Sequence, residues 1–188
     1  MKPTAALGIA CATLALAATA HATQVFHVPV EKMAVESDVV VHAVVVEQAV
    51  GWDDTHSRIL TSTTIEVLDA IKGASTGDRL EIYQVGGTVD GVTFSVPGRL
   101  EFAPGEEMVF FAMRFGEQLV SFGMGLGKWR VEERDGVAVV TAHYGDVAWV
   151  ERDRDRWAPA PEPPPDVESL ASFLGRLDEV LSSQEAGR

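Results

Sequence analysis

Hydrophobic and polar residues alternate along most of the chain, in the pattern of strands rather than helices. Residues 39–46 are almost all apolar and mostly β-branched, which predicts a central strand buried on both faces. Residues 59–67 alternate at every second position, which predicts a strand with one buried face. The same signals predict further strands at residues 79–83, 92–96, 108–115 and 128–132.

Two Asp-Gly pairs predict hairpin tips. Asp90-Gly91 and Asp135-Gly136 each stand where a two-residue turn needs a positive φ. Short strands at this spacing, with no long helices between them, are typical of antiparallel folds. We therefore expect a mainly β fold, either an antiparallel sandwich or a small closed barrel, and not a parallel α/β fold.

A short helix is predicted before the first long strand. Val30, Met33 and Ala34 fall at helical spacing, and Pro29 precedes them where a first turn tolerates proline. The pattern indicates one or two helical turns at residues 30–36.

The C-terminal part of the chain changes in composition. Residues 158–165 are rich in proline and are expected to form a stiff, extended linker. An amphipathic helix is predicted at residues 166–183, with Asp166 as its N-cap. Its apolar stripe consists of Val167, Leu170, Phe173, Leu174, Leu177, Val180 and Leu181. We expect this helix to cover the chain's own core, and docking on a partner is the alternative.

The first 22 residues have the anatomy of a signal peptide. Lys2 precedes an apolar stretch that is too short to span a bilayer, and an Ala-His-Ala pattern ends at residue 22. We expect cleavage before Thr23, with cleavage before His21 as the alternative. Cys11 is the only cysteine, so its removal leaves a mature chain without disulfides or thiol chemistry. The expected location is the periplasm or the extracellular medium.

Without the signal, the chain has 166 residues, with 28 acidic side chains and, because Lys2 is removed, 14 basic ones. This length predicts one β domain at residues 23–157. The formal charge of −14 repels polyanions, so nucleic acid is excluded as an expected partner. No second apolar run approaches the length of a membrane span.

The densest polar cluster is predicted in a loop between two long strands. Its members are Trp52, Asp53, Asp54, His56 and Arg58. Loops held on rigid sheets often carry binding groups, so we expect an interaction surface here, with Trp52 as a possible anchor. The two carboxylates and the imidazole offer metal ligands, but their spacing matches no metal motif, so a solvated hairpin loop is the preferred interpretation. No metal or cofactor is expected.

Other polar features are interpreted as structural. His27, His42 and His143 stand alone, and no local signature of a zinc protease, serine hydrolase or penicillin-binding enzyme is present. The glycine-rich stretch 123–127 is interpreted as a turn because a strand, not a helix, is expected after it. The alternating charges at 151–156 indicate a solvated face, with a recognition strip as the alternative.

Several of these segments resemble a known family. The carrying residues are Ser37-Asp38-Val39-Val40-Val41, Trp52, Arg58, Thr61, Ile65-Glu66-Val67-Leu68 and Ile71-Lys72-Gly73, which are similar to the opening of netrin-like and tissue inhibitor of metalloproteinase domains. Gly86-Gly87, Pro104-Gly105-Glu106-Glu107, Val109-Phe110-Phe111 and Gly127-Lys128-Trp129 resemble small exported bacterial β-domain proteins. The resemblance covers about residues 37–131 and implies an OB-like barrel. The family's inhibitors use a disulfide-fixed N-terminal cysteine, and the mature chain has none.

The sequence therefore predicts an exported, non-enzymatic binding or accessory module on an OB-like barrel. Its contact surface is expected in the 52–58 loop and the 86–98 segment, and its partner is expected to be another exported protein. Two alternatives stay open. One is inhibition of a secreted metalloprotease by a route without cysteine, and the other is a hydrolase with a dispersed site around His42 or His56.

Overall fold

The computed structural model describes residues 23–187 as a mainly β protein, and the predicted signal peptide lies outside these residues. In chain order the elements are β1 (Thr23–Val25), α1 (Val30–Glu36), β2 (Val39–Trp52), β3 (Ile59–Lys72), β4 (Arg79–Val85), β5 (Gly87–Val89), β6 (Val92–Phe94), β7 (Glu107–Phe115), β8 (Gln118–Ser121), β9 (Lys128–Arg134), β10 (Val137–Ala142), β11 (Val147–Asp153), β12 (Arg156–Pro159), β13 (Val167–Ser169) and α2 (Leu170–Ala186). All the predicted strands are present, and the predicted helix before β2 has the expected bounds.

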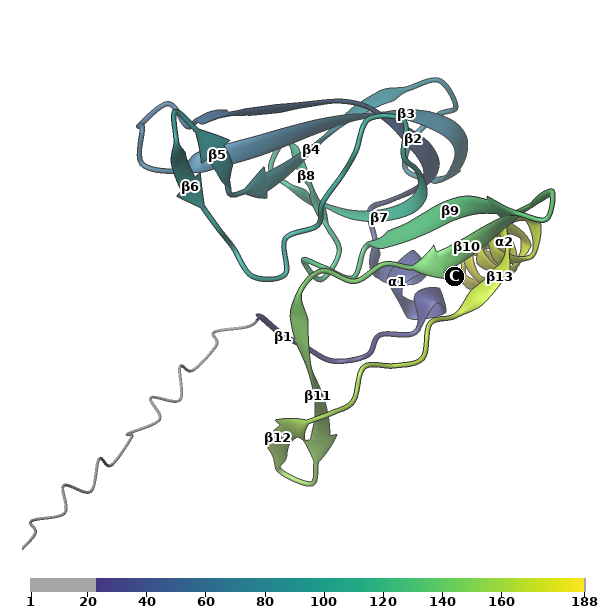
Figure 1. Cartoon of the computed structure of the whole chain (residues 1–188). Helices are drawn as coiled ribbons and strands as arrows, with labels where there is room; N and C mark the ends of the chain where they lie inside the picture. The colour runs from purple at the N-terminus through teal and green to yellow at the C-terminus, as the bar shows by residue number, and fades with distance from the viewer. Residues whose placement is uncertain (1–22, 188) are drawn as a thin grey trace, which may run out of the picture.

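The main sheet has eight strands in the order β13-β10-β9-β7-β2-β3-β4-β8 (Figure 1). An additional pairing joins β8 back to β7, so β2, β3, β4, β8 and β7 pair in a ring. All neighbours in this ring are antiparallel except β4 and β8, which are parallel and share a single residue pair, Ile82 with Leu119. The expected antiparallel character is therefore confirmed, with one short parallel contact.

Strands β2 and β7 lie between two hydrophobic clusters. Val39, Val41, Ala43 and Val45 belong to one cluster, whereas Val40 belongs to the other. Because successive side chains of a strand point to opposite faces, this division means that the first half of β2 is buried on both sides. The prediction from residues 39–46 is confirmed, and the same division separates Phe110 from Phe111 in β7.

The two halves of β2 differ in pairing. Three register shifts against β3 fall between Val40 and Glu47, and from Glu47 to Trp52 the strand pairs residue by residue with Thr64 to Ile59. Bulges bend a strand and increase its twist, so the irregular half is the one that curves around the core. The regular half extends as an arm that ends in the 52–58 loop (Figure 1).

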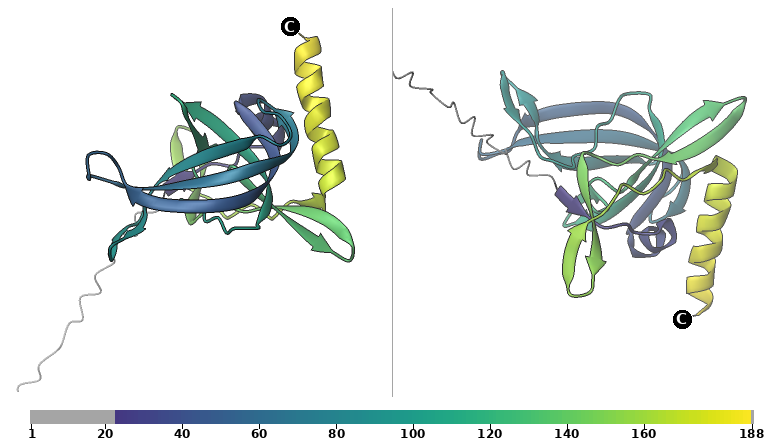
Figure 2. Two further views of the ribbon diagram at one scale, coloured as in Figure 1. Left: turned by 90° about the horizontal axis from the view of Figure 1, so that it is seen from above. Right: turned by 60° about the horizontal axis from the view of Figure 1, so that its bottom comes forward.

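The two helices, α1 and α2, pack against the cluster that contains Val40 and Phe111 (Figure 2). Phe173 and Leu177 of α2 are fully buried in the same cluster as Met33 and Ala34 of α1 and Trp129 of β9. The ring of Phe173 lies 4.9 Å from that of Trp129, between centroids. The expectation that this helix covers the chain's own core is confirmed.

The predicted start of this helix is wrong. Residues 167–169 form β13, which pairs antiparallel with Val139–Thr141 of β10, and α2 begins at Leu170. Ser169, not Asp166, is the N-cap, since its Oγ accepts a hydrogen bond from the backbone N–H of Ser172 at 3.2 Å. The edge of β10 offers backbone hydrogen-bond partners, so residues 167–169 pair with it as a strand although the sequence pattern predicted a helix there. Val167 is half exposed.

Both Asp-Gly hairpins are confirmed. Asp90 and Gly91 have φ of 50° and 79°, and Asp135 and Gly136 have 53° and 77°. They connect β5 to β6 and β9 to β10, as the turn chemistry predicted.

A three-stranded sheet, β1-β11-β12, was not predicted, and it changes the expected domain boundary at residue 157. Strand β12 continues through Pro159, and the backbone N–H of Ala160 donates to Trp149 O at 2.9 Å. The first part of the proline-rich segment is therefore attached to the sheet, and only residues after it lack regular structure up to β13. Within residues 23–187, no helix is long and apolar enough to cross a membrane.

Candidate functional site

The 52–58 loop is organised around the Asp53 carboxylate. This group accepts hydrogen bonds from the backbone N–H groups of Ser57 at 2.8 Å and Arg58 at 3.2 Å, and from the Arg58 Nε at 3.2 Å. The hydroxyls of Thr55 and Ser57 donate to it as well, each at 3.1 Å. A short polar side chain that bonds the backbone ahead of it stabilises a turn, and this arrangement holds the whole loop.

These hydrogen bonds explain the electrostatics of Asp53. The backbone N–H of Ser57, together with the donors of Arg58 and Thr55, holds the pKa of the Asp53 carboxyl well below its ordinary value of 3.8, although desolvation opposes the change. The side chain is 11% exposed. Asp53 therefore stabilises the loop and is not available to a ligand.

The other members of the predicted cluster remain accessible. Asp54, His56 and Arg58 are exposed, and Trp52 is half buried. The rings of Trp52 and His56 stack with centroids 6.1 Å apart, and His56 has a φ of 52°, in the left-handed region. Across residues 23–187, no three His, Cys, Asp or Glu side chains gather as a metal site.

The β5–β6 hairpin lies against the end of the β2–β3 arm. The backbone N–H of Gly86 donates to Ile59 O at 2.8 Å. A side chain at Gly87 would meet Val50 Cγ1 at 2.5 Å and Thr61 Oγ1 at 2.9 Å, so only glycine permits this approach. The structure thus brings the two segments expected to form the contact surface together.

Large apolar side chains are exposed where these segments meet. Phe94 is 44% exposed, and Val50 and Val92 are exposed to a similar degree. Phe94 pairs across the hairpin with Gly87, and cross-strand partners point to the same face, so Phe94 lies on the side of the hairpin that faces Val50. We call the set Val50, Trp52, Asp54, His56, Arg58, Val92 and Phe94 the arm surface.

Of the isolated histidines, His42 is buried and His143 is half buried. The Nε2 of His42 lies 2.6 Å from Glu107 Oε1, and its side chain is 11% exposed. Burial, reinforced by the positive charges of Lys128 and Arg130, lowers the pKa of His143. His42 is near the start of β2 and His56 lies beyond its end, so the structure does not bring these two histidines together.

Sequence reasoning missed a buried ion pair. The side chain of Lys128 is 1% exposed, and its Nζ lies 2.6 Å from Glu106 Oε1 and donates to Glu101 O at 2.5 Å. Burial lowers the pKa of Lys128 and would raise that of Glu106, but the hydrogen bond and charge of Lys128 hold the pKa of Glu106 below its ordinary value. Arg130 Nε also contacts Glu106, at 3.1 Å.

The ion pair joins two of the segments that carried the family resemblance. Glu106 belongs to Pro104-Gly105-Glu106-Glu107 and Lys128 to Gly127-Lys128-Trp129. The sequence pattern did not indicate this burial, since Lys128 alternates with Trp129 on the polar side of the predicted strand, together with Arg130 and Glu132. Buried charges need partners, so the pair is interpreted as structural.

The glycine-rich stretch 123–127 is a turn followed by β9, as predicted. A side chain at Gly127 would lie 2.4 Å from Phe111 O, and Met124 has a φ of 59°. The charged residues 151–156 form the exposed end of the β11–β12 hairpin, where Asp153 and Arg156 lie 3.8 Å apart. This agrees with a solvated face.

Comparison of the chain with protein-family models, with curated proteins and with solved structures gives no match.

Proposed function

We propose that this chain is an exported, non-catalytic binding module on an OB-like barrel, and that the arm surface contacts a partner protein. OB folds are five-stranded, partly open barrels that bind ligands on their second and third strands and in the loop between the first and second. In the ring that begins with β2, that loop is the 52–58 loop. The ring of pairings, with its single Ile82–Leu119 contact between β4 and β8, supports this architecture.

One observation carries the proposal: the β5–β6 hairpin lies against the end of the β2–β3 arm, and both segments expose large apolar side chains near a charged loop. Val50, Val92 and Phe94 are exposed, and the charged side chains of Asp54 and Arg58 lie on the adjoining loop. Protein interfaces combine an apolar centre with a polar rim, and exposed aromatic residues often supply much of the binding energy.

The rigidity of the arm favours the same function. Asp53 uses five donors to fix the 52–58 loop, and Gly86 and Gly87 attach the hairpin to β2 and β3. A surface that is ordered before binding loses less conformational entropy when the partner arrives. Such ordering is unnecessary for a solvated hairpin that contacts nothing.

The test uses the mature chain and two matched single variants. Phe115, 75% exposed at the end of β7, is the control, because β7 ends where β2 begins and Phe115 therefore lies away from the arm surface. Immobilised wild type and Phe115→Ala are expected to retain the same exported protein from the source organism, and Phe94→Ala is expected to lose it.

Two results would contradict the proposal. One is equal retention by all three proteins, and the other is a loss of retention by Phe115→Ala that matches the loss by Phe94→Ala. A melting curve of each variant, unchanged from wild type, keeps a folding defect from imitating lost binding.

A further inference from the structure

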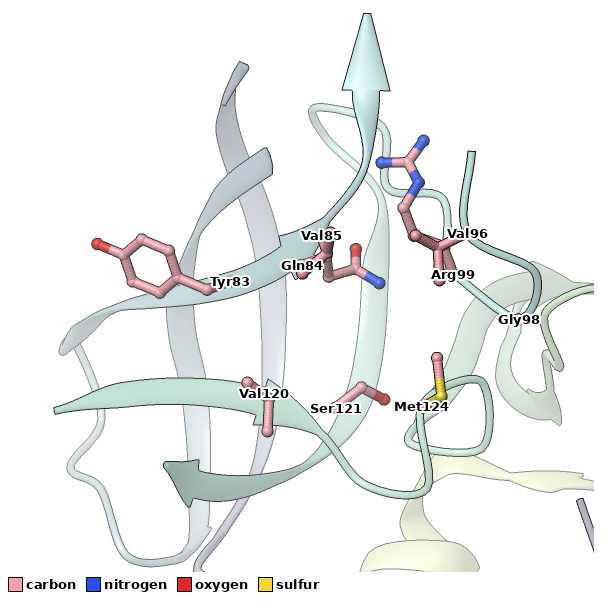
Figure 3. Close-up of a pocket in the computed structure, with 9 residues that line it drawn as sticks. All are labelled: Tyr83, Gln84, Val85, Val96, Gly98, Arg99, Val120, Ser121 and Met124. Carbon is pink, nitrogen blue, oxygen red and sulfur yellow. The ribbon is translucent and has the colours of Figure 1, made fainter. Parts of the chain in front are cut away.

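A pocket of about 280 Å³ lies where β4 and β8 separate (Figure 3). The two strands pair only at Ile82 and Leu119, and no other ladder pair joins them. The pocket is close to the lower end of the roughly 300–1,000 Å³ that small-molecule sites occupy, so its ligand would be small. It is distinct from the arm surface.

The walls of the pocket are largely apolar and come from three segments. Val85 belongs to β4, Val96 to the loop after β6, and Val120 to β8. Met124 closes one end and is 45% exposed. Figure 3 shows Gln84, Ser121 and Met124 directed toward the open space, whereas Tyr83 points away from it. An apolar body of a few carbon atoms fits these surfaces.

Gln84 keeps the pocket in shape. With its amide oriented to satisfy both groups, its side chain donates to Leu100 O and accepts from Leu100 N, each at 3.0 Å. This pair of hydrogen bonds fastens β4 to the loop that carries Val96 and Arg99. The cavity is therefore bounded by fixed elements on both sides, as preformed binding sites are.

Arg99 supplies the only charge among the residues that line the pocket, and its guanidinium lies at the end opposite Met124 (Figure 3). Its Nη1 donates to Thr61 Oγ1 at 3.3 Å, and among residues 23–187 no carboxylate forms an ion pair with it. A side chain at Gly86 would lie 3.3 Å from Arg99 Cδ, so glycine leaves room for the stem. Within the described residues this half-buried cation has no acidic partner, although the full sequence has a net charge of −13.

We propose that the pocket binds a small carboxylic acid with an apolar body. The carboxylate bonds the guanidinium of Arg99, whose planar fork matches its two oxygens, and the apolar body lies against Val85, Val120 and Met124. The acidic chain repels anions at long range, so selection of a carboxylate rests on the short-range contact with Arg99. The body supplies the remaining affinity by burying apolar surface.

The test uses three six-carbon probes that differ in their polar group: hexanoate, hexanol and hexylamine. Methionine methyl groups, labelled with carbon-13, report binding by nuclear magnetic resonance, with Met124 in the pocket and Met33 and Met108 as buried controls. Hexanoate is expected to shift the Met124 signal saturably and to bind at least about tenfold more tightly than hexylamine. The Met33 and Met108 signals are expected to stay in place.

Arg99→Gln removes the charge and keeps a polar side chain. It is expected to weaken hexanoate binding about tenfold or more and to leave the affinity for hexanol unchanged. Val120→Phe is expected to fill the pocket and abolish the response to all three probes, while the Met33 and Met108 signals report that the core is intact. Hexanoate binding that is unchanged in Arg99→Gln, or no response of Met124 to hexanoate in the wild type, would overturn the proposal.

Discussion

The two halves of β2 differ in composition, regularity and burial. From Val39 to Val45 the strand is bulged, curved and buried between two clusters, whereas from Glu47 to Val50 it is regular and exposed. The first half stabilises the fold because it contacts a core on each side. The second half contributes little burial, yet β3, the β5–β6 hairpin and Asp53 hold it in one conformation. This combination of order and exposure is what the proposed contact surface requires.

The largest expected effect lies at the buried half. Phe110 pairs with Val41 and is fully buried, so Phe110→Ala is expected to lower the free energy of unfolding by about 3–5 kcal/mol. Urea unfolding, followed by circular dichroism, measures the change. A loss below about 1 kcal/mol would mean that the first half of β2 is not the stabilising half.

The second effect concerns the buried ion pair between Lys128 and Glu106. Lys128→Met removes a fully buried cation from Glu106 and is expected to cost about 2–3 kcal/mol, because Glu106 loses its buried partner but keeps Arg130. The same urea titration measures it. Arg134→Met, which removes an exposed contact with Glu132, is the matched control, and a cost equal to that of Lys128→Met would contradict the structural role.

The third change, at Phe94 beside the exposed half of β2, distinguishes an effect on the free energy of unfolding from an effect on partner binding. Phe94→Ala is expected to change the free energy of unfolding by less than about 1 kcal/mol, since nearly half of the side chain is in water. Its large effect is expected in partner retention alone. A destabilisation as large as that of Phe110→Ala would show that the exposed arm is part of the core.

The smallest global effect is expected at Asp53. Asp53→Asn is expected to leave the melting temperature nearly unchanged while the amide protons of Ser57 and Arg58 exchange faster, because their acceptor loses its charge. Hydrogen exchange measured by nuclear magnetic resonance detects this change. Unchanged exchange at both amides would mean that the carboxylate does not hold the loop.

Low pH is expected to loosen the 52–58 loop of the wild type as Asp53→Asn does, because protonation also removes the charge of Asp53. The folded-state pKa of Asp53 lies below 3.8, so the contribution of its charge is complete above that pH and is lost as the pH falls through the lower folded value. Exchange at Ser57 and Arg58, corrected for intrinsic rates, is therefore expected to be constant well above pH 3.8 and to rise progressively as the pH falls below it, because the open loop takes up a proton before the folded loop does. Exchange that does not change as the pH falls below 3.8 would contradict the hydrogen-bonding arrangement.

The sequence predicted the parts of the fold that local chemistry determines. The apolar run of β2, the alternation of β3 and the two Asp-Gly turns each specify their conformation within a few residues. It did not predict β13, because the segment takes a strand conformation only through its pairing with β10, which is far away in sequence. The β1-β11-β12 sheet was missed for a similar reason, since β1 has only three residues and pairs with β11 across more than a hundred.

In the candidate site, too, the sequence predicted what depends on local residues and missed what depends on tertiary contacts. Trp52, Asp54, His56 and Arg58 lie on the predicted loop, but residue types alone did not separate Asp53, which binds its own backbone, from Asp54, which faces solvent. Phe94 lies in the 86–98 segment that was expected to contribute, but its position beside the arm depends on Gly87, whose approach to Val50 depends on the tertiary fold. The pocket at Arg99 depends on the separation of β4 from β8, which has no local signature.

Photo-cross-linking tests the assignment of contact to the exposed half most directly. A photoreactive phenylalanine analogue is placed at position 94 or at position 115, both exposed, and each protein is irradiated in the exported fraction of the source organism. One discrete adduct with another protein is expected from position 94, and none is expected from position 115. The same adduct from both positions, or an adduct from position 115 alone, would contradict this assignment.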